Sequence, residues 1–326
     1  MRAVVLRSHG GPDVLQFEDV ASPYIGEQDI LVTVAATALN RADLLQRMGF
    51  YPNPFSSGPE IPGLEFAGTV AAIGDKVTAW SIGDRVMGIT SGGAYAEQVA
   101  IHERQAIAVP SSMSLHDAAG IPEVFITAWD ALVLQGGLTS GRWAMVHAGA
   151  SGVGTAAIQI CKAIGARIVV TCSGGKVEKC RALGADVVVD YGTQDFVAEV
   201  AAATAGKGVD VILDVIGGDY VERNVACLAV KGHIIQVGVM AGKPVSFNVG
   251  LLLGKRASIT GTVLRARPLE EKIAISQRFA TEMLPLFDSG DLKPVIDSTY
   301  AFADIASAHE YMATNGNVGK IVITVA

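Results

Sequence analysis

The chain has 326 residues, half of them hydrophobic, 37 glycines and a formal net charge of −7 at pH 7. This length allows two domains that each bury a core, and the acidic balance without Lys/Arg runs argues against nucleic-acid binding. No apolar run reaches the roughly 18 residues that span a membrane. The four cysteines lack the spacing of a disulfide framework, and residues 1–6 enter a strand without signal-peptide features. We therefore expect a cytoplasmic α/β enzyme.

Short apolar runs dominate the first part of the chain. They are bounded by Gly, Pro, Asp and Ser, which predicts a β-rich domain rather than strand–helix repeats. These runs are 2–6, 30–35, 69–73, 85–89, 94–101 and 106–109. Residues 40–48 are the helical exception. An extended loop is predicted after them, because proline recurs there at Pro52, Pro54, Pro59 and Pro62.

The middle of the chain has a different pattern. A helix over 117–134 is expected to break or kink at Pro122. Apolar runs then alternate with helical segments, and six such runs predict a Rossmann fold, a doubly wound parallel sheet. The runs are 143–148, 167–172, 187–189, 211–215, 233–237 and 258–262.

The end of the chain returns to the first domain in this interpretation. A long amphipathic helix covers 270–287, and residues 295–326 supply a strand, a helix and a final strand. We expect this tail to complete the β-rich domain. The predicted domains are therefore 1–122 with 268–326, and a nucleotide-binding domain at 123–267.

A glycine-rich turn lies between the first two strands of the nucleotide-binding domain. Gly149, Gly152 and Gly154 follow the run at 143–148 and precede a helical segment. Such a turn places helix N–H groups against a pyrophosphate. Ser151 replaces the middle glycine of the usual Gly-x-Gly-x-x-Gly spacing, so an ordinary tight turn is the alternative. The flanking strand and helix favour the nucleotide site.

The end of the second strand indicates which nicotinamide cofactor binds. An NAD site usually has Asp or Glu about 20 residues after the turn. Residues 155–177 contain no carboxylate and offer Ser173, Gly174, Gly175 and Lys176 instead. A small hydroxyl group, two open backbone N–H groups and a cation suit a 2′-phosphate, which predicts NADPH. The alternative is that Lys176 is a solvated lysine at the start of a helix.

Several segments, in order, resemble one family over essentially the whole chain. They are Ala38-Leu39-Asn40-Arg41-Ala42-Asp43, Pro62-Gly63-Leu64-Glu65-Phe66-Ala67-Gly68, Gly83-Asp84-Arg85-Val86, residues 147–159 around the glycine turn, Asp214-Val215-Ile216-Gly217-Gly218 and Asn317-Val318-Gly319-Lys320-Ile321-Val322. The family is the medium-chain dehydrogenase/reductase superfamily, and within it the zinc-independent quinone oxidoreductases. The chain is most similar to their tumour-suppressor-inducible subgroup. The resemblance implies a chaperonin-10-like catalytic β-domain, a Rossmann domain that binds NADPH, and a homodimer joined through the nucleotide domains.

The resemblance also implies roles for individual residues. Ser151, Gly152 and Val153 would contact the pyrophosphate, and Ser173, Lys176 and Tyr191 would surround the adenosine 2′-phosphate and ribose. The remaining cofactor residues would be Asn40, Thr127, Gly238, Met240, Val263, Leu264 and Asn317. Two of these have plain structural alternatives: Tyr191 could cap a strand and Asn317 could form a turn.

Zinc is not expected, because the positions that bind it in alcohol dehydrogenase relatives lack Cys and His. The first falls in Leu39-Asn40-Arg41 and the second reads Gly63-Leu64-Glu65. Glu65 alone cannot supply the three or four ligands that zinc needs. The six histidines are isolated from one another in the sequence, so they are expected to be core or surface residues.

Without a metal, the acceptor itself must be electron-poor, and quinones qualify because their reduction yields an aromatic hydroquinone. Asn40 and Tyr51 are the predicted catalytic residues, with positioning or polarising roles; Asn40 could instead only cap the helix after it. A 2-enoyl thioester reductase of the same superfamily is the first alternative function. A non-catalytic NADPH-binding redox sensor is the second.

Overall fold

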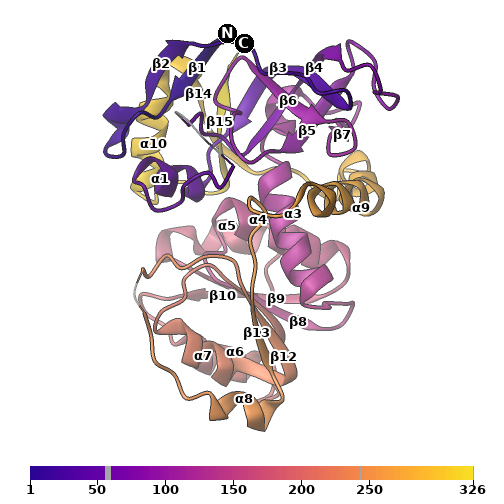
Figure 1. Cartoon of the computed structure of the whole chain (residues 1–326). Coiled ribbons are helices and arrows are strands. Elements are labelled where there is room, and N and C mark those ends of the chain that lie inside the picture. Colours follow the sequence, from indigo (N-terminus) through magenta and orange to yellow (C-terminus); the bar gives the residue numbers. More distant parts are fainter. Residues whose placement is uncertain (56–59, 243, 326) are drawn as a thin grey trace. The chain divides into compact units, whose positions relative to one another are not determined.

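The computed structural model of the chain describes residues 1–55, 60–242 and 244–325 (Figure 1). It divides into two units, Met1–Ile126 with Leu264–Ala326 (unit 1) and Thr127–Val263 (unit 2). The sequence placed these divisions at 122/123 and 267/268. Pro59, part of the predicted extended loop, lies outside the described residues.

Unit 2 contains a six-stranded sheet in the order β10-β9-β8-β11-β12-β13. Every neighbouring pair is parallel. The strands are β8 (Trp143–Val146), β9 (Arg167–Cys172), β10 (Val187–Asp190), β11 (Val209–Asp214), β12 (Leu228–Gln236) and β13 (Ser258–Gly261). This order and direction are those of two βαβαβ halves, so the predicted Rossmann fold is confirmed.

Helices cover both faces of this sheet (Figure 1). On one face, α6, α7 and α8 enclose a core that includes Phe196, Val225 and Ile212. Apolar strands buried on both faces explain why the runs in the sequence are continuous rather than alternating. The helical elements of unit 2 are η2 (Asp130–Gln135, a π-helix), α4 (Gly152–Ala163), η3 (Gly174–Lys176), α5 (Val177–Ala182), α6 (Phe196–Ala203), α7 (Tyr220–Cys227) and α8 (Gly250–Lys255).

The helix predicted over 117–134 is several elements. α2 ends at Ala118 (Leu115–Ala118), and Pro122 begins a new helix, α3 (Pro122–Trp129), which leads into the π-helix η2. Proline is favoured at the first helical position, because its missing N–H would be unpaired there in any case. The predicted break at Pro122 is therefore confirmed, and the segment forms separate helices rather than one kinked helix.

The main sheet of unit 1 has the order β14-β15-β3-β4-β5-β7, and β6 also pairs with β3. The C-terminal strand β15 runs antiparallel to β3, with Val322 opposite Ala38, so the tail does join the N-terminal β-domain. The strands are β3 (Asp29–Ala38), β4 (Glu65–Ile73), β5 (Arg85–Ile89), β6 (Gln98–His102), β7 (Ile107–Ala108), β14 (Ile296–Ala301) and β15 (Lys320–Thr324), beside a separate hairpin of β1 (Arg2–Val5) and β2 (Gln16–Asp19).

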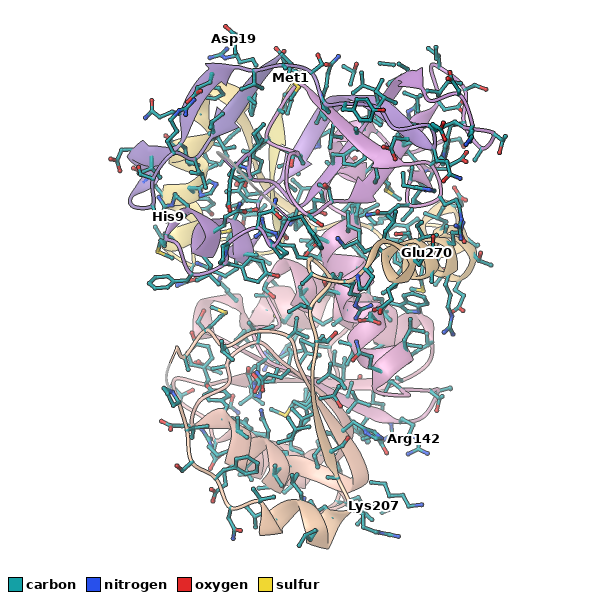
Figure 2. The ribbon with its side chains drawn as sticks, viewed as in Figure 1. Met1, His9, Asp19, Arg142, Lys207 and Glu270 are labelled. Carbon is teal, nitrogen blue, oxygen red and sulfur yellow. The ribbon has the colours of Figure 1, made fainter. Side chains whose placement is uncertain are left out.

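The helices of unit 1 pack around these strands. The interior of the unit includes Phe66, Val86 and Val99 on one side of the main sheet and Leu44, Tyr95 and Ile321 in a second cluster. Charged side chains such as Asp19 and Glu270 project outward (Figure 2). The helices are η1 (Pro12–Val14), α1 (Arg41–Arg47), α2, α9 (Leu269–Asp288), η4 (Phe302–Asp304) and α10 (Ile305–Ala313), with most of α3. No helix in the described part of the chain has the length and apolar character to cross a membrane.

Candidate active site

The predicted cofactor residues of unit 2 follow the carboxyl ends of its parallel strands. Since these ends meet at one edge of the sheet, the topology brings the residues to a common edge, where open α/β sheets bind ligands. Exposure fits this placement, because Tyr191, Met240 and Val263 are 55%, 49% and 46% exposed. The residues are Ser151, Gly152 and Val153 after β8, Ser173 and Lys176 after β9, Tyr191 after β10, Gly238 and Met240 after β12, and Val263 after β13.

The glycine turn connects β8 to α4. Gly154 allows the close approach of helix and turn, since an added Cβ would lie 2.4 Å from the carbonyl oxygen of Ala148. Gly149 is packed against β9, where its Cβ would lie 2.5 Å from that of Val170. Ser151, in place of the middle glycine, is the N-cap of α4, and its hydroxyl accepts the Gly154 N–H at 3.0 Å. The substitution therefore keeps the helix start intact, with first-turn N–H groups available to an anion.

A buried polar chain supports the strand that leads into this turn. His147 is 1% exposed, and its ring nitrogens contact the Thr171 hydroxyl at 3.0 Å and the Asn224 amide oxygen at 2.8 Å. The Asn224 amide donates in turn to Asp214 at 2.9 Å. Burial lowers the pKa of His147, which keeps the ring neutral. His147 is a core residue, as expected.

The predicted adenosine end of the site contains both a positively and a negatively charged side chain, those of Lys176 and Asp190. Ser173 precedes η3, Lys176 ends it, and Gly174 and Gly175 between them are exposed. Asp190, which was not predicted from the sequence, pairs with Cys172 across the sheet. A Cβ on Gly174 would lie 2.7 Å from an Asp190 carboxylate oxygen. This carboxylate comes from the next strand, so inspection of residues 155–177 alone could not find it.

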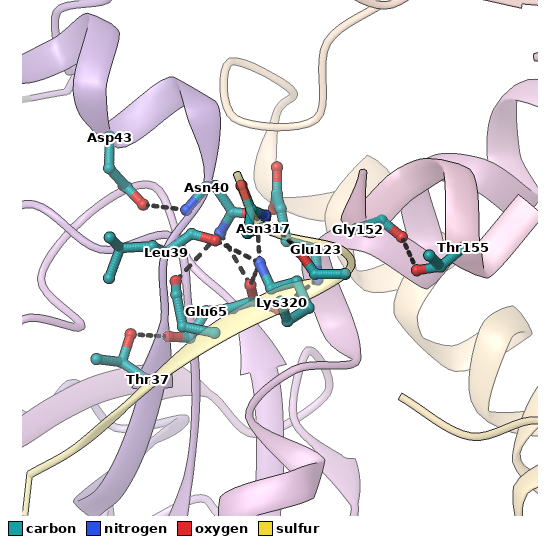
Figure 3. A network of polar contacts seen from close by, with 12 residues as sticks. Thr37, Leu39, Asn40, Asp43, Glu65, Glu123, Gly152, Thr155, Asn317 and Lys320 are labelled. Carbon is teal, nitrogen blue, oxygen red and sulfur yellow. Dashed lines mark hydrogen bonds and ion pairs between the residues drawn. The ribbon is translucent and has the colours of Figure 1, made fainter. Parts of the chain in front are cut away.

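In unit 1, Asn40 is both a helix N-cap residue and part of a buried polar cluster (Figure 3). Its backbone N–H donates to the Asp43 carboxylate at 2.7 Å. Its side-chain amide donates to Glu65 Oε1 at 2.8 Å, and its amide oxygen accepts from Lys320 Nζ at 2.7 Å. Both nitrogen and oxygen of the amide are thus fixed. The capping role considered from the sequence and a positioning role are compatible.

Glu65 and Lys320 form the centre of this cluster, an ion pair 2.7 Å long between Oε1 and Nζ. Glu65 is fully buried and Lys320 is 2% exposed. Lys320 also donates to the Leu39 carbonyl at 2.6 Å, and the second Glu65 oxygen accepts the Glu123 N–H at 2.8 Å. These contacts satisfy a pair of charges that would otherwise be costly to bury.

The cluster does not fit a catalytic zinc. The Glu65 carboxylate is paired with the Lys320 ammonium group, a cation that would repel a metal ion at this oxygen. The residues before it, Gly63 and Leu64, offer no side-chain ligand. Across residues 1–55, 60–242 and 244–325, no three His, Cys, Asp or Glu residues form a group that could hold a metal ion.

Tyr51 lies in the loop after α1, against Arg265. The Arg265 guanidinium donates to the Tyr51 carbonyl at 2.8 Å and lies 5.1 Å from the centre of its ring. Burial, followed by the nearby charge of Glu123, raises the pKa of the Tyr51 hydroxyl. A hydroxyl with a raised pKa is a poorer proton donor at neutral pH. The geometry favours a positioning role for Tyr51.

Glu123, the second residue of α3, is a titratable group that was not predicted from the sequence. It is partly buried beside the Asn40–Glu65–Lys320 cluster (Figure 3). Burial, followed by the charge of Glu65, raises its pKa from 4.5 to about 8. Nothing in its local sequence marks this environment, since a glutamate in a first helical turn is ordinary.

The other predicted cofactor residues are nearly buried. Thr127 on α3 is 8% exposed, Leu264 is 7% exposed and Asn317 is 9% exposed. The Asn317 amide donates to the Gly319 carbonyl at 2.8 Å, which is the turn arrangement considered as its structural alternative. Thr127 belongs to unit 2, and Leu264 and Asn317 belong to unit 1.

Two protein families match parts of the chain. The "Alcohol dehydrogenase GroES-like domain" family matches residues 26–111, and the "Zinc-binding dehydrogenase" family matches residues 183–323. The first match lies within unit 1. The second covers much of unit 2 and the C-terminal part of unit 1.

Individual relatives match nearly the whole chain. The synaptic vesicle membrane protein VAT-1 homolog of Rattus norvegicus is 31% identical, over 99% of this chain and 84% of the relative. An NADPH-dependent alkenal/one oxidoreductase of Arabidopsis thaliana chloroplasts is 31% identical, over 99% of this chain and 79% of the relative. The crystal structure of Escherichia coli quinone oxidoreductase complexed with NADPH has 29% identity and a TM-score of 0.89, covering all of both chains.

Proposed function

The chain belongs to the medium-chain dehydrogenase/reductase superfamily and is an NAD(P)-dependent oxidoreductase, and from this we propose that it is a zinc-independent NADPH:quinone reductase. The observation that carries the proposal is the ion pair between Glu65 and Lys320. Glu65 belongs to the segment that corresponds to the zinc-binding segment of alcohol dehydrogenase relatives, and Lys320 already neutralises its charge. Without a Lewis acid at that carboxylate, the acceptor must be electron-poor by its own chemistry. A quinone meets this requirement, because its reduction restores an aromatic ring.

NADPH, when bound, supplies the hydride. The N-terminus of α4 after Ser151 would bind the pyrophosphate, and Ser173 and Lys176 would bind the 2′-phosphate. Asn40 would orient the acceptor or the nicotinamide amide. Because Glu65 and Lys320 hold both ends of its amide, Asn40 loses little conformational freedom on binding. Tyr51, held by Arg265, would line the acceptor site.

An activated alkene is the second candidate acceptor. It is favoured by the 31% identity to a protein described as an alkenal/one oxidoreductase. Enones, enals and 2-enoyl thioesters share with quinones an electron-poor carbon conjugated to a carbonyl. The same donor site could therefore reduce either class, and only turnover distinguishes them.

Stopped-flow measurement of NADPH oxidation should show rapid turnover with 1,2-naphthoquinone or 1,4-benzoquinone, and slower turnover with an enone or a 2-enoyl thioester. Addition of a zinc chelator should leave both rates unchanged. Turnover confined to the alkenes would replace the quinone assignment with the alkene reductase. Tight NADPH binding without oxidation by any of these acceptors would support the redox sensor instead.

We also propose a homodimer joined through unit 2. β13 is the last strand of its sheet, and the described residues offer it no partner beyond β12. Exposed apolar side chains lie nearby in the sequence, with Val249 61% and Leu253 78% exposed. An open strand edge beside apolar surface favours association. Sedimentation equilibrium should give about twice the chain mass of 33.8 kDa, whereas a monomer at micromolar concentration would contradict the proposal.

A further inference from the structure

Glu123 is an acid without a hydrogen-bond partner for its carboxyl group in the described part of the chain. Its backbone N–H is used, donating to Glu65 Oε2 at 2.8 Å. Pro122 before it begins α3, which fixes the direction in which the chain enters the helix. The residue as a whole is partly buried, and its carboxyl group lies beside the Asn40–Glu65–Lys320 cluster (Figure 3).

Charged and titratable groups from several elements of unit 1 act on Glu123. Glu65 on β4 and Asp43 on α1 oppose its ionisation, and Lys320 on β15 and Arg265 favour it. The charge of Glu123 acts in turn to raise the pKa of Tyr51 and the pKa of Lys272, which is on α9. Burial has the largest effect, and the resulting pKa of about 8 keeps Glu123 protonated at neutral pH.

The neighbouring groups are less suited to give up a proton. Asn40 has no acidic proton, and Glu65 is held in an ion pair with Lys320. Asp43 is fully buried with a pKa raised to about 6, and it accepts the Asn40 N–H. The pKa of Tyr51 is raised above that of an ordinary phenol. Glu123 therefore combines a proton at pH 7 with a carboxyl group that has no hydrogen-bond partner among the described residues.

We propose that Glu123 is the proton donor for the reduced acceptor. The proposal rests on the proposed function, in which NADPH is oxidised and the acceptor gains a hydride. When the hydride adds to the acceptor, the negative charge moves to the acceptor's carbonyl oxygen, which becomes an oxyanion. The Oε–H bond of Glu123 then breaks as an O–H bond forms on that oxygen, giving a hydroquinone or an enol. Glu123 remains as a carboxylate and takes a new proton from water.

Glu123→Gln should lower kcat by about 100- to 10,000-fold, the usual contribution of a general acid, and leave the Kd for NADPH within about threefold. Wild-type kcat should fall as the pH rises through about 8, where Glu123 loses its proton. The Gln variant should lack this alkaline limb, and Glu123→Asp should retain it at reduced kcat. Glu271→Gln, at a first-turn glutamate of α9 that is exposed, is the control and should behave like wild type.

A measurement without cofactor tests the raised pKa of Glu123 by itself, independently of turnover. Because the folded-state pKa of Glu123 is raised, the folded chain binds more protons than the unfolded chain between pH 4.5 and about 8. Its contribution to stability therefore falls as pH rises through that range. Glu123→Gln should remove this dependence and unfold at a higher temperature than wild type near pH 8.

The outcomes separate this proposal from the proposed function. If wild type reduces no quinone or alkene, the proposed function fails and Glu123 has no acceptor to protonate. If wild type is active and Glu123→Gln keeps its kcat and alkaline limb, only the role of Glu123 is overturned. Should the Gln variant fail to fold, an Asp variant with no alkaline limb would equally overturn it.

Discussion

Replacing Lys320 by methionine should lower the free energy of unfolding by about 3–5 kcal/mol, because breaking a buried ion pair leaves an unpaired charge in the interior. Glu65 is fully buried, and its contact with the Lys320 ammonium is 2.7 Å long. Methionine keeps most of the lysine stem, so the loss would come from the charge rather than from a cavity. Urea unfolding followed by circular dichroism measures the change.

Two further variants isolate the ion pair. Lys207→Met removes an exposed lysine and should change the free energy of unfolding by less than about 0.5 kcal/mol. The double variant Glu65→Gln/Lys320→Met removes both charges and should be more stable than Lys320→Met alone. Equal losses for Lys320→Met and Lys207→Met would show that the buried pair does not hold the cluster together.

Lys176→Ala should weaken NADPH binding by about 10- to 100-fold and change NADH binding by less than about threefold. A hydrogen bond to a charged group is worth about 1.5–3 kcal/mol, and each 1.4 kcal/mol is about tenfold in affinity. Only NADPH carries the 2′-phosphate that Lys176 would bind. Fluorescence titration of each cofactor on the native chain and the variant gives the two ratios.

Asp190→Asn tests the same 2′-phosphate site by removing a negative charge, whereas Lys176→Ala removes a positive one. The Asp190 carboxylate lies against Gly174, where a 2′-phosphate would meet like charge. Removing that charge should tighten NADPH binding up to about tenfold. NADH binding should become weaker or stay unchanged. Equal affinities of the native chain for the two cofactors, or parallel losses for both in Lys176→Ala, would contradict the 2′-phosphate assignment.

The sequence by itself determined the nucleotide-binding half of this protein. Its six apolar runs correspond to the six parallel strands β8–β13, and the glycine turn lies between β8 and α4 as predicted. These features are local, because a buried parallel strand needs a continuous apolar run and the turn needs small residues at fixed spacing. Local pattern also located the break at Pro122, although it could not show that two helices meet there.

Only the tertiary structure decided how the polar groups of the site are paired. Lys320 and Asn40 are 280 residues apart in the chain, and Glu123 and Glu65 are 58 apart, yet each pair is joined by one hydrogen bond. The first contact exists because β15 pairs with β3, which ends two residues before Asn40. Asp190 reaches Gly174 for a similar reason, since β10 pairs with β9. Charge, burial and pKa depend on such long-range pairings, and residue spacing along the chain does not encode them.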